Sequence, residues 1–185
     1  MPGILTPGDS IGAACALQLA AEGCDLALTY SSSKGAAESL VEKIKATYPL
    51  ESRKMTIHKA DMGVPDEVVK MCEAVRSEHG RGVEVLVANA GYGKRIRDVS
   101  DIPLEEFEYT INVNLRAPFL CVKGVVDDMK AANWGRIIFM GSIAAFGGGV
   151  NVRYRPPFRP PFRPLARLSS SRTITARLPP PPELN

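Results

Sequence analysis

No run of about 18 apolar residues occurs in this sequence, so the length that a membrane-spanning helix requires is missing. The N-terminus also lacks the basic segment followed by an apolar run that marks a secretory signal. These two absences exclude the usual signs of a membrane or exported protein. We therefore expect a cytoplasmic protein that has no membrane partner.

Residues that commonly bind metals are scarce. The two histidines, His58 and His79, do not stand at a spacing typical of metal ligands. The four cysteines lie far apart and form no Cys-x-x-Cys pair: Cys15, Cys24, Cys72 and Cys121. We predict no metal site, and we interpret the cysteines as buried, reduced thiols.

Lysine is absent after Lys130, and the composition changes near Val150. Residues 151–185 hold nine of the fifteen prolines and seven arginines, with a single acid, Glu183. This segment carries a charge of +6, whereas the whole chain carries +3, so the charges of residues 1–150 sum to −3. We therefore expect no nucleic-acid partner. We predict a folded domain over 1–150 and a disordered Pro/Arg-rich tail over 151–185.

Apolar runs and helical periodicity alternate through the first 150 residues. We predict strands at 3–6, 25–30, 55–60, 83–88 and 135–140, and helices at 11–22, 35–48, 65–80 and 103–130. Pro118 should kink the last of these helices. This alternation is typical of an α/β fold, and it predicts a Rossmann-type, doubly wound parallel sheet with the strand order 3-2-1-4-5.

The turn between the first strand and the first helix is a candidate phosphate-binding loop. Glycines allow a phosphate to approach the backbone, and a helix N-terminus offers free N–H groups. Pro7 has no N–H and Asp9 is negatively charged, so we expect weak binding, and an ordinary turn is the alternative. The candidate cofactor ligands in this turn are Thr6, Gly8, Ser10, Ile11 and Gly12.

Polar motifs follow the later strands in a fixed order. They are Asp61-Met62, Ala88-Asn89-Ala90-Gly91, Asn112-Val113-Asn114-Leu115 and the strand from Gly135 that ends at Ser142. Each alone is typical of a turn, a cap or a locally bonded helix residue. Together, at these spacings, they resemble the short-chain dehydrogenase/reductase family, and its 3-oxoacyl-ACP reductase-like members in particular, over about residues 4–150.

The resemblance implies an oxidoreductase that interconverts a small-molecule carbonyl and an alcohol with a nicotinamide cofactor. It places Asn114 and Ser142 among the catalytic residues. It places Asp61 and Met62 beside the adenine, and the Asn89, Ala90 and Gly91 motif on the adenosine side of the cofactor. It also implies that the long helix around Asn114 can form the interface of a homo-oligomer.

The end of the second strand indicates which cofactor is used. Many proteins that use NAD place an acid there, to bind the ribose 2′-hydroxyl. This sequence has Ser31, Ser33 and Lys34 instead, which suit a 2′-phosphate. We therefore favour NADP(H) over NAD(H), with a solvated Lys34 as the alternative.

One part of the family pattern is missing. The resemblance calls for a catalytic Tyr with a Lys four residues later, but the residue four after Tyr154 is Phe158. We interpret the chain as an N-terminal family part that is truncated or frame-shifted after about residue 150, lacks the last two strands and is inactive. The alternative is a non-catalytic fragment for nucleotide binding or oligomerisation. The sequence does not identify the substrate.

Overall fold

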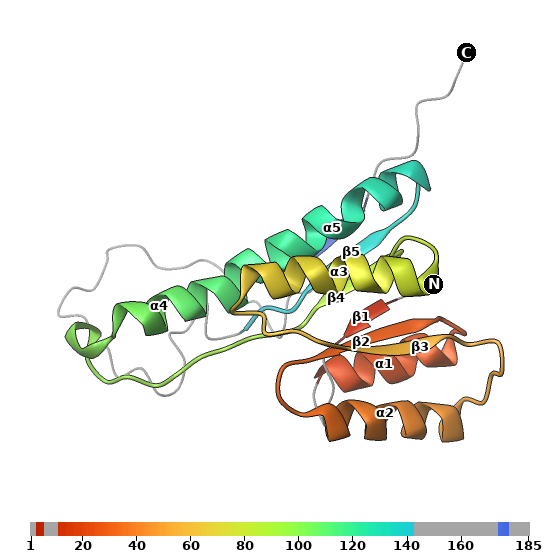
Figure 1. Cartoon of the computed structure of the whole chain (residues 1–185), viewed down its shortest axis with the longest axis horizontal. Helices are drawn as coiled ribbons and strands as arrows, with labels where there is room; N and C mark the ends of the chain where they lie inside the picture. The colour runs from red at the N-terminus through yellow and green to blue at the C-terminus, as the bar shows by residue number, and fades with distance from the viewer. Residues whose placement is uncertain (1–2, 6–10, 143–173, 178–185) are drawn as a thin grey trace, which may run out of the picture.

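The computed structural model describes residues 3–5, 11–142 and 174–177 (Figure 1). Within these ranges one six-stranded sheet has the order β3-β2-β1-β4-β5-β6. Strands β1 to β5 pair in parallel with their neighbours, and β6 pairs antiparallel with β5. The strands span Gly3–Leu5 (β1), Leu26–Tyr30 (β2), Met55–Lys59 (β3), Val85–Ala88 (β4), Arg136–Phe139 (β5) and Ile174–Arg177 (β6).

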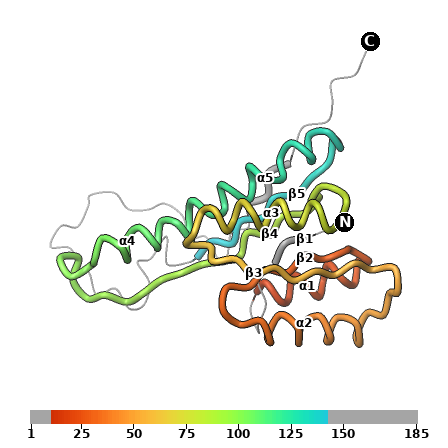
Figure 2. Tube along the Cα trace, in the orientation of Figure 1, coloured from red at the N-terminus to blue at the C-terminus, as the bar shows by residue number. Residues whose placement is uncertain are grey.

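Helices cover both faces of the sheet. Helices α1 and α2 pack on one face, and α3 and α5 pack on the other (Figures 1 and 2). Helix α4 lies beyond the sheet at one end of the molecule (Figure 1). The helices span Ile11–Ala21 (α1), Lys34–Thr47 (α2), Pro65–His79 (α3), Leu104–Ile111 (α4) and Ala117–Ala131 (α5), with short helical turns at Val99–Asp101 (η1) and Asn112–Arg116 (η2).

Strand β2 shows why this sequence forms a sheet that is buried on both faces. Successive strand residues point to opposite faces. Leu26 and Leu28 enter the core under α1 and α2, whereas Ala27 enters the core under α3 and α5. All three side chains are fully buried, which explains the continuous apolar run in the sequence.

The expected disorder of the tail is wrong for residues 174–177. These residues form β6, whose Ile174 is the register partner of Phe139 in β5. Ile and Thr favour strands, and residues 165–178 contain no proline, so the composition of the whole tail concealed a short strand. The edge of β5 offers unpaired N–H and C=O groups, which β6 satisfies. The rest of the tail and the expected boundary near Val150 lie outside the described residues.

The expected single helix over 103–130 is divided into three parts. A π-helical turn, η2, separates α4 from α5, and Pro118 lies in the first turn of α5 rather than at the irregularity. A proline ring crowds the carbonyl four residues earlier and provides no N–H. Pro118 therefore disturbs the hydrogen bonding at Asn114, which lies inside η2.

Candidate functional site

A cleft of about 770 Å³, part of it open to solvent, lies at the carboxyl ends of β2, β3 and β4. Parallel sheets commonly bind ligands at this edge, on either side of the central strand. Tyr109 of α4 and Val113 of η2 complete the wall. The cleft is lined by Thr29, Tyr30, Ser31, Ala60, Asp61, Met62, Asn89, Ala90, Gly91, Tyr92, Tyr109 and Val113.

The cleft brings together six of the residues predicted from the sequence. They are Ser31, Asp61, Met62, Asn89, Ala90 and Gly91, from the ends of three different strands. Sequence reasoning missed the two tyrosines, Tyr92 and Tyr109. Tyr92 directly follows Gly91, the last residue of the predicted motif, so the motif could have indicated it. Nothing in the local sequence pattern indicates Tyr109.

Asp61 is held firmly at the start of the loop after β3. Its Oδ1 accepts hydrogen bonds from the backbone N–H of Gly63 at 2.7 Å and from the hydroxyl of Tyr109 at 2.9 Å. Its own N–H donates to Oε2 of Glu67 at 2.7 Å. The bond to Asp61 raises the pKa of Tyr109, because a phenolate would face a carboxylate. Tyr109 therefore stays protonated and donates.

Asn114 holds the loop after β4. Its Oδ1 accepts from the N–H of Tyr92 at 2.9 Å, and its Nδ2 donates to the carbonyl of Tyr92 at 2.7 Å. Asn112, in the same π-helical turn, donates to the carbonyl of Gly63 at 3.1 Å. Both loops that border the cleft are thus fixed to η2.

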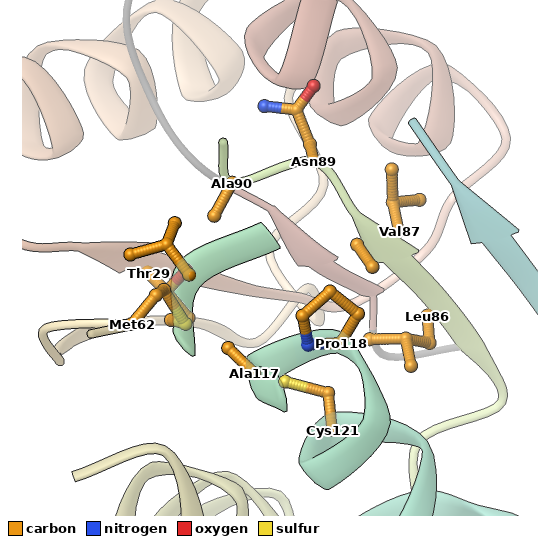
Figure 3. A pocket seen from close by; sticks show the side chains of 11 residues that line it. Thr29, Met62, Leu86, Val87, Asn89, Ala90, Ala117, Pro118 and Cys121 are labelled. Carbon is orange, nitrogen blue, oxygen red and sulfur yellow. The ribbon is translucent and has the colours of Figure 1, made fainter. Parts of the chain in front are cut away.

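A small apolar cavity, with only about 20 Å³ of free volume, adjoins the cleft. Figure 3 shows Ala117, Pro118 and Cys121 of α5 around the same space as Leu86 and Val87 of β4. The thiol of Cys121 also forms a hydrogen bond with Cys72 of α3. That bond, together with burial, raises the pKa of Cys121, so this wall of the cavity is a neutral thiol.

The residues predicted to select the cofactor lie where β2 leads into α2. Ser31 lines the cleft. Ser33 precedes the first residue of α2, Lys34, which forms an ion pair with Glu38 at 3.1 Å and is exposed. The hydrogen bond to Glu38 raises the pKa of Lys34, so this lysine stays charged. Ser33 and Lys34 lie outside the lining of the cleft.

The remaining predicted residues lie around the cleft or outside the description. Ile11 and Gly12 form the first turn of α1, where Ile11 is 60% exposed and Gly12 is buried. Ser142 follows β5 and is exposed. None of these three lines the cleft, and the same holds for Asn114. Thr6, Gly8, Ser10 and Tyr154 lie outside the described residues.

Tyr92, which lines the cleft, shares the carboxylate of Glu106 with Lys94. Glu106 accepts a hydrogen bond from Tyr92 and forms an ion pair with Lys94 at 3.1 Å. The bond to Glu106 raises the pKa of Tyr92. The carboxylate between the two side chains therefore makes Tyr92 a weaker acid, which is opposite to what proton donation at neutral pH requires.

All four cysteines are free thiols, and three of them are buried. In residues 3–5, 11–142 and 174–177, His, Cys, Asp and Glu form no group of three that could hold a metal ion. No helix in the same ranges is long and apolar enough to span a membrane.

Several solved structures resemble this chain. A blue fluorescent protein from a metagenomic library, in complex with NADPH, is 34% identical, with a TM-score of 0.67 over 80% of this chain and 58% of that one. A xylitol dehydrogenase bound to NAD⁺ is 27% identical, with a TM-score of 0.68 over 82% of this chain and 56% of that one. This chain therefore shares its fold with one structure in complex with NADPH and with another bound to NAD⁺.

Two curated proteins are also similar in sequence to this chain. The 3-oxoacyl-(acyl-carrier-protein) reductase FabG of Staphylococcus epidermidis is 38% identical over 138 residues, which is 72% of this chain and 52% of that protein. D-beta-hydroxybutyrate dehydrogenase of Rhizobium meliloti is 32% identical over 132 residues, 71% of this chain and 49% of that protein. The chain thus spans about half the length of these relatives. The family model for short chain dehydrogenases matches residues 4–154, and the chain belongs to that family.

Proposed function

We propose that this chain binds NADP(H) in the cleft and carries the cofactor half of an oxidoreductase that acts on small carbonyl or alcohol compounds. The observation that carries the proposal is the convergence of Ser31, Asp61 and the Asn89–Gly91 motif on one cleft at the carboxyl ends of three strands. This edge is the usual dinucleotide site of a doubly wound sheet. We expect the protein in the cytoplasm, as its sequence predicts.

The cleft suits the adenosine part of a dinucleotide. Asp61 provides a fixed acceptor, while Met62, Ala90 and Val113 provide apolar walls for a flat ring. Beyond the cleft, Gly12 lies in the first helical turn after β1, and the N–H groups of such a turn favour phosphate. We propose Thr6, Gly8, Ser10 and Ile11 as further contacts in that loop.

The preference for NADP(H) depends on the start of α2. Ser31, Ser33 and Lys34 provide two hydroxyls and a cation there, and residues 31–35 contain no acid that would repel a 2′-phosphate. The N-terminus of α2 adds a favourable dipole. The blue fluorescent protein similar to this chain is in complex with NADPH, whereas the xylitol dehydrogenase is bound to NAD⁺.

The proposed reaction chemistry uses Asn114 and Ser142. When bound, the nicotinamide supplies or accepts a hydride. The hydroxyl of Ser142 would donate a hydrogen bond to the carbonyl oxygen of the substrate, and Asn114 holds the neighbouring loop. A proton donor is still required, and Tyr154 has Phe158 where a lysine would lower its pKa. We therefore propose that the chain as written binds cofactor without measurable turnover.

A second candidate function is a non-catalytic role that combines nucleotide binding with association. Four large apolar side chains on α4, η2 and α5 are more than half exposed: Leu104 (66%), Phe107 (55%), Leu115 (65%) and Phe119 (64%). Such exposed residues favour a protein–protein contact. Sedimentation of the chain beside Phe119→Asp tests this role. A monomer at all concentrations would exclude it.

Calorimetric titration of the full chain with NADPH and NADH tests the proposed function. We expect tighter binding of NADPH, and a loss of about fivefold in that preference for Lys34→Ala, the size typical of an exposed ionic contact. Lys43→Ala, an exposed lysine elsewhere on α2, is the matched control. Tighter NADH binding would reject the preference, and no binding of either dinucleotide would reject the function.

A further inference from the structure

Tyr109 contacts the loop after β3 in two ways. Its hydroxyl donates to Oδ1 of Asp61 at 2.9 Å, and its ring lies against the backbone of Gly63. A Cβ added to Gly63 would overlap that ring, so only glycine allows the ring this close approach. Asn112 also donates to the carbonyl of Gly63, so α4 and η2 both hold this loop in place.

These contacts fix the orientation of the Asp61 carboxylate. Oδ1 already accepts two hydrogen bonds, from Gly63 and from Tyr109. Among the described residues no donor contacts Oδ2, while the backbone N–H of Asp61 is bonded to Glu67. Rotation of the carboxylate would break the Tyr109 bond or the Gly63 bond. Oδ2 is therefore left as the acceptor that Asp61 can offer to a ligand in the cleft.

The walls beside Asp61 suit a flat ring. Tyr92 and Tyr109 pack edge to face, with ring centroids 4.8 Å apart and an angle of 88° between the rings. Both tyrosines line the cleft, together with Met62 and Val113. A carboxylate accepts hydrogen bonds and cannot donate them. The best ligand group for this position is an amino group on a planar heterocycle.

We propose that Tyr109 is a positioning residue that sets the base specificity of the cleft by holding Asp61 ready for a base that carries an amino group. Adenine carries such a group, whereas hypoxanthine has a carbonyl at the same place, which would face the carboxylate. A site built around a hydrogen bond strongly rejects the analogue that lacks the matching group. This inference rests on the proposed function, because it assigns the adenine end of the dinucleotide to this part of the cleft.

The test compares NADPH with its hypoxanthine analogue, reduced nicotinamide hypoxanthine dinucleotide phosphate, by calorimetric titration of the full chain. We expect the unchanged chain to bind NADPH about 10-fold more tightly, in line with one hydrogen bond to a charged group. In Tyr109→Phe the preference should fall to about threefold or less, because Asp61 is then free to turn. Tyr48→Phe, which removes a hydroxyl away from the cleft, should keep the full preference.

Asp61→Asn is the second variant, and it tests the carboxylate directly. An amide can donate to the carbonyl of hypoxanthine, so we expect the preference to vanish or reverse. The inference would be overturned if Tyr109→Phe weakened the binding of both dinucleotides by the same factor, because a purely structural role has that effect. Equal binding of both dinucleotides by the unchanged chain would overturn the inference alone. No binding of either would overturn the proposed function as well.

Discussion

Asn112 and Asn114 stand two positions apart in η2, yet they hold two different loops. Asn112 donates to the carbonyl of Gly63 at 3.1 Å, and Asn114 bonds both backbone groups of Tyr92 at 2.7 and 2.9 Å. Each residue of a helix advances by roughly a quarter of a turn, so side chains two positions apart point to different sides. One turn of helix therefore sets the distance between the loops after β3 and β4, which are two walls of the cleft.

Replacing Asn114 with Ala should loosen the loop after β4. Two hydrogen bonds are lost from an exposed site, so we expect the free energy of unfolding to fall by about 1 kcal/mol. NADPH binding should weaken more than stability does, because the loop borders the cleft. Urea unfolding and calorimetry measure the two effects. Asn112→Ala is the matched control, and it should instead lower the preference for NADPH over its hypoxanthine analogue. Identical effects of the two variants would contradict the view that the two asparagines hold different loops.

Two histidines should make stability depend on pH. Thr56 Oγ1 lies 2.7 Å from Nε2 of His58 and 2.9 Å from Nε2 of His79, and Nδ1 of His79 is buried without a partner. Burial lowers the pKa of both histidines below 6.5, although Glu78 opposes this at His58 and Asp25 opposes it at His79. The nearby cations Lys54 and Arg81 lower the pKa of His79 further.

The sign of the effect follows from proton linkage. Below about pH 6.5 the unfolded chain binds protons that the folded histidines resist, so stability falls as pH falls from 6.5 towards the folded pKa values. Urea unfolding between pH 8 and pH 5 measures this slope. The double variant His58→Gln, His79→Gln should reduce it, and an unchanged slope would show that other groups cause the loss.

The chain as written should show no carbonyl reduction above background. The oxygen that gains charge during hydride transfer needs a proton, and a positioned acid is typically worth about 10²–10⁴ in rate. Oxidation of NADPH with a panel of ketones and 3-oxoacyl thioesters measures this, beside Ser142→Ala and Tyr154→Phe. Turnover that disappears in Tyr154→Phe would show that Tyr154 does reach the site.

Thiol labelling should separate one cysteine from three. Cys15 is half-buried, whereas Cys24, Cys72 and Cys121 are buried. Burial also raises the pKa of Cys24, which keeps little of its thiolate form at neutral pH. We expect one fast reaction with an aromatic disulfide reagent, absent in Cys15→Ser, and three further reactions only on unfolding. Fast reaction of Cys121 would show that the apolar cavity opens to solvent.

The sequence predicts strands β1 to β5 and most helix ends to within one or two residues, but not β6. Strand β2, for example, was expected at 25–30 and spans Leu26–Tyr30, because its apolar run is bounded by a glycine and by serines. The contact of Tyr109 with Asp61 joins residues 48 positions apart, so no local pattern contains it. The sequence predicts a kink at Pro118, whereas the structure has the irregularity earlier, in η2. A proline disturbs the carbonyl four residues before it, but the sequence pattern marks only the proline itself.

The pairing of β6 with β5 has a consequence for how freely this part of the chain can vary. Strands pair through backbone groups that every residue except proline possesses in full. Residues 174–177 can therefore change identity widely and still complete the edge, provided that proline stays out. In a library of random substitutions at these four positions, most members should fold. Selection for solubility should remove mainly the members that contain proline.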